Sequence, residues 1–234
     1  MTLPEPAREP HRREIKSFVR REGRLTTGQK TALETHWPVY GVEAPAAPLN
    51  LAALFGRIAP TVMEIGFGNG EQLLARAAAE PQYDFIGVEV HRPGVGRVLA
   101  HAAETGLKNI RVACHDAVEV LKDWLPAESL DELLIYFPDP WHKLRHHKRR
   151  LIQPAFATLA ASRLKPGGRL YLATDWANYA EHMLTVLNAE SQLKNLAADA
   201  AYLPRPQTRL VSKFERRGHK LGHAVFDLGY ERVG

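Results

Sequence analysis

Asp139 carries a carboxylate and lies between two prolines, in the stretch YFPDPWHK at residues 136–143. An apolar run at 130–137 precedes it and predicts a β-strand that the prolines interrupt. Because proline fixes φ, the pair limits the backbone around Asp139 and can aim the side chain at a ligand beyond the strand's carboxyl end. The alternative is an ordinary proline turn in which Asp139 caps the following segment.

A glycine-rich turn, EIGFGNG at residues 64–70, lies between another predicted strand and a predicted helix. Gly66 and Gly68 let the backbone turn tightly and approach a ligand. The spacing departs from the dinucleotide fingerprint, and Glu71 would repel a pyrophosphate at the start of the helix. A ligand without phosphates, such as S-adenosylmethionine, suits the turn better, and Glu64 with the loop would hold its amino acid part. A turn that only joins strand to helix is the alternative.

Two further carboxylates follow the next two predicted strands. Glu89 ends the second strand, nineteen residues after Gly70, where it can accept hydrogen bonds from both hydroxyls of an adenosine ribose. Asp116 follows the third strand and can meet the adenine amino group. Since the carboxyl ends of parallel strands share one edge of a sheet, both side chains are expected to line the same crevice as Asp139.

These residues need a framework that brings strand ends together. Strands are predicted at 61–65, 84–89, 109–114, 130–137 and 169–174, and helices at 71–80, 92–105, 117–124, 150–164 and 176–189. This alternation predicts an α/β fold with a mostly parallel, doubly wound sheet. Extended segments at 210–216 and 221–232, around Arg217-Gly218-His219, predict an antiparallel C-terminal strand pair.

Residues 1–50 differ from the rest of the chain. They are rich in proline and strongly basic between Arg8 and Arg24, with little apolar periodicity. We therefore expect a flexible, positively charged N-terminal arm at 1–50 and one folded domain at 51–234. A solvated tail without a role is the alternative.

The bulk composition excludes several classes of protein. Cys114 is the only cysteine among 234 residues, so an internal disulfide is impossible, and no metal dependence is expected. No segment approaches the ~20 uninterrupted apolar residues of a membrane-spanning helix. The first residues lack a signal-peptide core, so we expect a cytoplasmic protein without membrane association, either monomeric or homodimeric.

The segment after Asp139 is strongly basic. Residues 143–150 read KLRHHKRR, with five Lys or Arg in eight positions, and the whole chain has a formal net charge of +5. Such runs are usually solvated. This one adjoins the expected crevice and leads into a predicted helix, where a phosphate would also meet free backbone N–H groups. The run therefore favours a polyanionic partner such as RNA.

Taken together, these motifs resemble those of the tRNA (guanine-N7)-methyltransferase family. The resemblance rests on EIGFGNG, GVEVH, FPDPWHK with the following RHHKRR, LKPGGRLYLATDW and RLVSKFERRGHKLGHAVFDLGYER. These motifs extend over nearly the whole expected domain, and PDPW and KFE are the specific ones. Membership implies a Rossmann-like class I S-adenosylmethionine-dependent methyltransferase fold. It also implies transfer of a methyl group from S-adenosylmethionine to N7 of guanine 46 in the variable loop of tRNA.

The resemblance also implies roles for single residues. Contacts with S-adenosylmethionine are implied for Glu64, Glu89, Asp116 and Asp139, with Asp139 as the active-site residue. Substrate contacts are implied for Lys143, Asp175, Ser212, Lys213, Phe214 and Glu215. RNA contacts are implied for Arg145, His146, His147, Lys148, Arg149 and Arg150. Ser212 lies where the family commonly has threonine, and it keeps the hydroxyl group.

Three other functions compete with this interpretation. A Rossmann-like methyltransferase with another RNA, a protein or a small molecule as substrate would explain the glycine turn and Glu89, but it leaves the basic run without a role. A non-catalytic RNA-binding module would have no need of the four carboxylates. An NAD-dependent reductase fits least, because of the glycine spacing.

Overall fold

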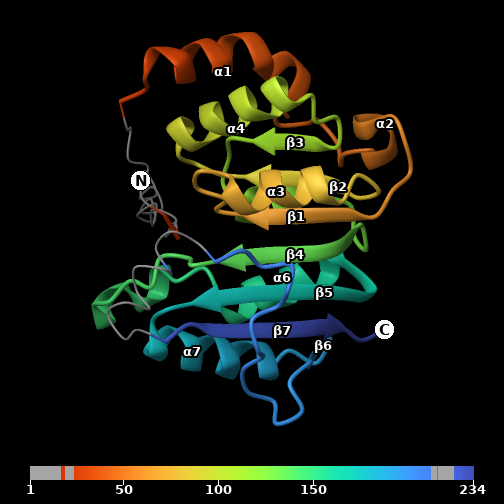
Figure 1. The fold of residues 1–234 in the computed structure, drawn as a ribbon. Coiled ribbons are helices and arrows are strands. Elements are labelled where there is room, and N and C mark those ends of the chain that lie inside the picture. The colour runs from red at the N-terminus through yellow and green to blue at the C-terminus, as the bar shows by residue number, and fades with distance from the viewer. Residues whose placement is uncertain (1–16, 19–23, 212–214, 216–223) are drawn as a thin grey trace, which may run out of the picture.

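The computed structural model describes residues 17–18, 24–211, 215 and 224–234, which form a seven-stranded sheet covered by helices (Figure 1). The strand order is β3-β2-β1-β4-β5-β7-β6. The strands are β1 (Thr61–Ile65), β2 (Asp84–Val88), β3 (Ile110–Ala113), β4 (Leu130–Tyr136), β5 (Leu164–Thr174), β6 (Leu193–Asn195) and β7 (Phe226–Arg232). Strands β1 to β5 pair in parallel, and β7 pairs antiparallel with β5 and β6. The expected mostly parallel, doubly wound α/β fold is confirmed.

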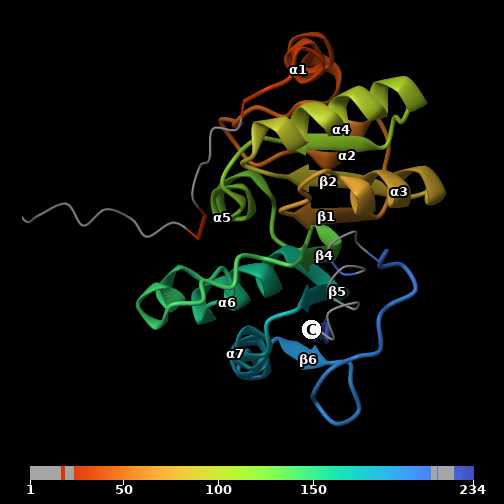
Figure 2. The same ribbon diagram turned by 60° about the vertical axis from the view of Figure 1, so that its left-hand side comes forward.

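Helices cover both faces of this sheet. They are α1 (Thr27–Tyr40), α2 (Leu51–Phe55), α3 (Glu71–Ala79), α4 (Arg92–Thr105), α5 (Ala117–Glu119), the π-helical turn η1 (Val120–Trp124), the 3-10 helix η2 (Leu144–Arg149), α6 (Pro154–Arg163) and α7 (Ala177–Asn188). Figure 2 shows α3 and α4 on one side of the strands and α5, α6 and α7 on the other. Among the described residues, no helix has the length and apolar character that crossing a bilayer requires.

The alternation of side chains along the strands divides the core into two clusters. Val62 of β1 packs with apolar residues of α1, α3 and α4, whereas its neighbour Met63 packs with those of α6 and α7. Both side chains are fully buried, as expected for a parallel strand that is covered on both faces. Glu64, two residues after Val62, therefore points to the α3 side of the sheet.

The expected N-terminal arm is wrong for the residues that form α1. This helix begins with a capping box, in which the Thr26 hydroxyl and the Gln29 side chain each accept a backbone N–H of the other residue. It packs along α4, where the Tyr40 hydroxyl donates to the carbonyl of Ala102 at 3.1 Å. A Cβ on Gly96 would lie 2.8 Å from the Gln29 carbonyl oxygen, so a glycine there allows the close approach. Tertiary packing, absent from local sequence patterns, stabilises this helix.

The C-terminal antiparallel arrangement is confirmed, and the segment expected at 221–232 contains β7 (Phe226–Arg232), but the partner expected at 210–216 is wrong. Strand β7 pairs with β5 and with the short β6, and Leu210 and Val211 belong to no strand. The backbone before Val211 is held instead by the Gln72 side chain of α3, which donates to the Thr208 carbonyl and accepts from the Leu210 N–H, both at 2.7 Å. Residues 212–214 and 216–223 lie outside the described residues.

Candidate active site

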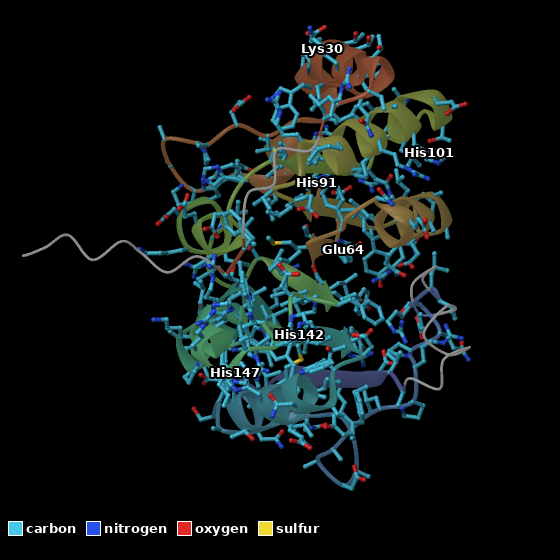
Figure 3. All side chains as sticks on the ribbon, turned by 90° about the vertical axis from the view of Figure 1, so that its left-hand side faces the viewer. Lys30, Glu64, His91, His101, His142 and His147 are labelled. Carbon is cyan, nitrogen blue, oxygen red and sulfur yellow. The ribbon has the colours of Figure 1, made fainter. Side chains whose placement is uncertain are left out.

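The strand order reverses between β1 and β4, and the carboxyl ends of these two strands carry the site. Figure 3 looks onto this edge, with Glu64 near the centre, His91 at the start of α4 on one side and His142 on the other. In an open parallel sheet, this is where two loops diverge to opposite faces and leave a crevice for a ligand. Both the glycine turn and the PDPW stretch lie there.

The glycine turn faces open space at Gly66 and Gly68, and its backbone packs against α4. Gly66 and Gly68 have φ angles of 72° and 55°, and a Cβ at either position would meet no atom within 4 Å. Behind the turn, a Cβ on Gly94 of α4 would collide with the Gly68 carbonyl oxygen. The backbone can therefore approach a ligand on its open side while α4 supports it.

Glu89, directly after β2, is fixed by backbone donors. Its Oε2 accepts the N–H of Gly68 at 2.9 Å, and its Oε1 accepts those of Val90 at 2.6 Å and His91 at 3.0 Å. Three such bonds hold the carboxylate in one orientation and tie β2 to the glycine turn. The side chain is therefore pre-organised to accept further hydrogen bonds from a ligand.

Glu64 differs from Glu89 because one of its carboxylate oxygens has no hydrogen-bond partner among the described residues. It is 4% exposed, and within the described part of the chain its Oε2 has no hydrogen-bond partner. Burial raises the pKa of Glu64 to about 8; Arg76 lowers this pKa and the nearby charge of Glu89 raises it. A buried, unpaired carboxylate is costly, so a ligand with a cationic N–H donor would be bound strongly at this position.

The PDPW loop is strained and held in place by its surroundings. Phe137 and Trp141 on either side of it have φ angles of 53° and 48°, which non-glycine residues rarely adopt. The loop begins at a hydrogen bond from Phe137 N–H to the Ala173 carbonyl of β5 at 2.8 Å. It ends where the Arg150 Nε donates to the Pro140 carbonyl at 2.9 Å. Strain of this kind persists only where neighbours impose it, and it is common at active sites.

Asp139 is exposed at the tip of this loop, and Asp175 is exposed after the adjacent strand β5. The rings of His142 and Trp176 meet in a T-shaped contact, with centroids 4.3 Å apart, and so connect the two loops. Two carboxylates thus project from neighbouring strand ends at the edge where the buried Glu64 lies. Such an arrangement can orient a polar ligand through its N–H groups and stabilise positive charge on it.

Comparison with known proteins identifies the family. A family model described as "Putative methyltransferase" matches residues 58–228. The tRNA (guanine-N(7)-)-methyltransferase of Salmonella typhimurium strain LT2 is 57% identical over 221 residues, which cover 94% of this chain and 92% of that protein. The protein of that name from Yersinia enterocolitica is 56% identical over 220 residues, with the same coverage. This chain belongs to the tRNA (guanine-N7)-methyltransferase family.

Solved structures agree on the fold. The 16S rRNA methyltransferase KamB superposes with a TM-score of 0.61 at 18% identity, covering 84% of this chain and 99% of its own. The 16S rRNA (adenine(1408)-N(1))-methyltransferase of Catenulisporales acidiphilia gives a TM-score of 0.57 at 17% identity, with 84% and 98% covered. The methyltransferase described here therefore has the class I fold that the sequence indicated.

The methyltransferase brings the expected cofactor residues to one edge of its sheet. Glu64, the two turn glycines and Glu89 lie at the ends of β1 and β2, and Asp139 follows β4. Asp116 follows β3 and caps α5, where its Oδ1 accepts the Val118 N–H at 3.0 Å. Within the described ranges, no three or more His, Cys, Asp or Glu residues cluster as metal ligands do.

The basic run divides into exposed and enclosed members. Lys143, Arg145 and Lys148, here called the cationic trio, are exposed, whereas His146, His147 and Arg149 are half-buried. The Arg149 guanidinium lies 4.1 Å from the centre of the Trp141 ring and donates to the Phe18 carbonyl at 3.2 Å. The Trp141 indole N–H donates to the Ser17 carbonyl at 3.0 Å, so residues 17–18 lie against the PDPW loop.

Arg150, expected to contact RNA, is only 3% exposed. Besides Pro140, its guanidinium donates to Asn178 Oδ1 at 2.8 Å and lies over the Tyr179 ring. The charge of Arg150 is therefore directed at the underside of the PDPW loop and at α7. A cation count along the sequence cannot separate such a buried arginine from its exposed neighbours.

Of the expected substrate segment, Ser212, Lys213 and Phe214 lie outside the described residues, and Glu215 is buried against Arg209. Two residues that the sequence interpretation did not single out, Arg209 and Asp227, complete that contact. Neither follows a strand end or a glycine turn, so no local signal marked them.

Proposed function

We propose that this methyltransferase transfers a methyl group from S-adenosylmethionine to N7 of a guanine in tRNA, namely guanine 46 of the variable loop. The observation that carries the proposal is 57% identity over 94% of the chain with a tRNA (guanine-N(7)-)-methyltransferase. The arrangement of Glu64, Glu89 and Asp139 at the strand-order reversal supports it, because that edge is where this fold binds its ligands. Position 46 comes from the resemblance of the motifs.

The residues at this edge fit S-adenosylmethionine. The unpaired Oε2 of Glu64 would accept a hydrogen bond from the cationic α-amino group, which removes the cost of burying that carboxylate alone. The open side of Gly66 and Gly68 leaves room for the chain of the ligand. Glu89 and Asp116 would accept hydrogen bonds from the ribose hydroxyls and the adenine amino group. When bound, the cofactor supplies an electrophilic methyl group on a sulfonium.

The residues of the chain then have the task of orientation. Guanine N7 is a hydrogen-bond acceptor with a free lone pair, so no base is needed to remove a proton from it. Asp139, Asp175 and Glu215 would accept hydrogen bonds from the N1–H and N2–H groups of the flipped guanine. These donors become more acidic as the base gains positive charge, so the bonds strengthen toward the transition state. Fixed carboxylates therefore accelerate transfer without proton chemistry.

The cationic trio would contact the RNA backbone. It lies on the loop that leads away from Asp139, where phosphates must pass if a base is to enter the crevice. Phosphate contacts of this kind position the nucleic acid and carry no sequence information themselves. The choice of guanine would then come from the carboxylates.

The test is incubation with labelled S-adenosylmethionine and unmodified tRNA, followed by nucleoside analysis. We expect label in 7-methylguanosine, and we expect none in a tRNA whose guanine 46 is replaced by adenine. Label in 7-methylguanosine from both tRNAs would refute only the assignment to position 46, and guanine-N7 methylation of tRNA would stand. No transfer to tRNA, with transfer to another RNA or to protein, would refute the substrate.

A further inference from the structure

A buried ion cluster connects Glu215 with Arg209 and with β7. It consists of Arg209, Glu215 and Asp227, which are 1%, 5% and 4% exposed. The Arg209 Nε and Nη2 donate to the two oxygens of Asp227 at 2.5 and 2.9 Å. The Nη1 and Nη2 donate to the two oxygens of Glu215 at 2.7 and 2.9 Å. One guanidinium thus donates hydrogen bonds to both oxygens of each of the two carboxylates.

The backbone of Arg209 is fixed independently of these ion pairs. Gln72, in the first turn of α3, makes hydrogen bonds to the residues on either side of it, Thr208 and Leu210. Helix α3 follows the glycine turn directly. The position of Arg209 is therefore tied to the helix that begins at the glycine turn.

The guanidinium also lies against the start of the PDPW loop. Its carbon is 5.7 Å from the centre of the Phe137 ring and 6.0 Å from that of Tyr136. Phe137 is the strained residue at which the loop begins. Arg209 consequently contacts Glu215, the end of β4 from which the PDPW loop leads, and β7 through Asp227.

The geometry of this contact restricts Glu215 more than a single ion pair would. A guanidinium presents its N–H donors in a rigid plane, so a carboxylate bound through both oxygens can neither rotate nor slide. A lysine ammonium is a point charge and would hold the same carboxylate through one oxygen in several orientations. Because Arg209 is itself held by Gln72 and Asp227, the orientation of Glu215 follows from that of Arg209.

We propose that Arg209 is a positioning residue for methyl transfer, which fixes the orientation of Glu215 and ties it to the helix after the glycine turn and to the PDPW loop. This inference rests on the proposed function, through the role given there to Glu215. The competing explanation is that the cluster only stabilises the fold by joining β7 to the preceding segment. The two explanations predict different values of kcat for a variant that combines a substitution at Arg209 with one at Glu215.

The experiment is a double-mutant cycle on kcat with Arg209→Lys, Glu215→Gln and the double variant, at saturating S-adenosylmethionine and tRNA. We expect R209K to lower kcat about 100-fold, as a misplaced catalytic group does. Its dissociation constant for S-adenosylmethionine should stay within threefold of the parent. In the R209K background, E215Q should lower kcat by less than threefold further. Losses in kcat that multiply in the double variant would overturn the proposal.

Arg232 offers a matched control on the opposite edge of the sheet. It is 8% exposed and donates to the carbonyls of Ala161 and Leu164 at 2.9 and 2.8 Å. R232K also replaces a buried guanidinium, so it should lower the melting temperature while kcat of the folded protein stays within twofold. If R232K lowers kcat as much as R209K does, the effect at Arg209 is one of stability alone, and the proposal fails.

Should R209K not fold, Gln72→Leu takes its place, because it removes the two hydrogen bonds that bracket Arg209 and leaves all charges in the cluster. We expect Q72L to lower kcat at least tenfold, and an unchanged kcat would overturn the proposal. Parent enzyme that forms no 7-methylguanosine on tRNA would instead remove the proposed function, and the role of Arg209 with it. If R209K is as active as an active parent, only the role of Arg209 is refuted and the proposed function stands.

Discussion

Replacing Glu64 with glutamine should stabilise the fold and abolish cofactor binding at the same time. The carboxylate is buried in β1, and within the described part of the chain its Oε2 has no hydrogen-bond partner. Glutamine has nearly the same shape and carries no charge. The substitution therefore removes the cost of burying an ion and leaves the packing beside α3 in place.

The size of the effect follows from the pKa of Glu64, which burial raises from 4.5 to about 8. The folded protein keeps a proton on this group that the unfolded chain releases, so the contribution to stability is full below pH 4.5 and is lost as the pH rises through 8. At about 1.36 kcal/mol for each pH unit, the loss reaches roughly 3–5 kcal/mol. E64Q should match the parent near pH 5 and exceed it by that amount at pH 9.

Urea unfolding of both proteins between pH 5 and 9 measures this difference. Glu71, exposed in the first turn of α3, offers a control for the loss of a carboxylate, since E71Q should change the unfolding free energy at pH 7 by less than about 0.5 kcal/mol. Calorimetry should show that S-adenosylmethionine binding by the parent releases close to one proton at pH 7 and that E64Q does not bind. If the difference in unfolding free energy between E64Q and the parent is constant from pH 5 to 9, a raised pKa of Glu64 is refuted.

Three further changes test the rest of the site. Asp139→Asn should retain S-adenosylmethionine binding and lose roughly 2–4 kcal/mol of transition-state stabilisation in single-turnover methylation; transfer at the parent rate would contradict its assigned role. Replacing the cationic trio with glutamine should weaken tRNA binding and make the slope of log K against log salt shallower by roughly 0.7–0.9 for each phosphate that the enzyme no longer neutralises; an unchanged slope would exclude a role for the trio at the RNA backbone. Gly68→Ala should cost about 1–2 kcal/mol of stability, because its φ is positive, and should also weaken cofactor binding. Gly106→Ala, at a φ of 68° after α4, should cost the same stability without affecting the cofactor, as titration calorimetry would show.

Much of the fold could be predicted because its signals are local. Strand β1 and helix α4 have the bounds that the sequence predicts, since apolar runs and glycines mark them without reference to the rest of the chain. The position of Asp139 follows from the same kind of signal. A proline pair after a buried strand predicts a loop at the ligand edge, and the structure places the loop there.

The features that sequence reasoning missed depend on distant partners. Helix α1 was missed because its packing joins residues 62 apart, as in the contact of Tyr40 with Ala102. Arg150 looked like part of a phosphate-binding run, but its partners include Asn178, 28 residues away. Arg209 lies in a segment without periodicity. For each of these residues, burial decides the role, and burial is a property of the folded chain.

The environments of the carboxylates suggest how pH should act on the enzyme. Glu89 is held by three backbone N–H groups, and Glu215 is held by Arg209, so both are fixed before a substrate arrives. Glu64 is the carboxylate that must change its ionisation near neutral pH to bind a cation. Transfer to N7 removes no proton beforehand, so the chemical step needs no general base. Below pH 8, therefore, a falling pH should raise the KM for S-adenosylmethionine by up to tenfold per unit, because Glu64 must release its proton before the cationic amino group binds.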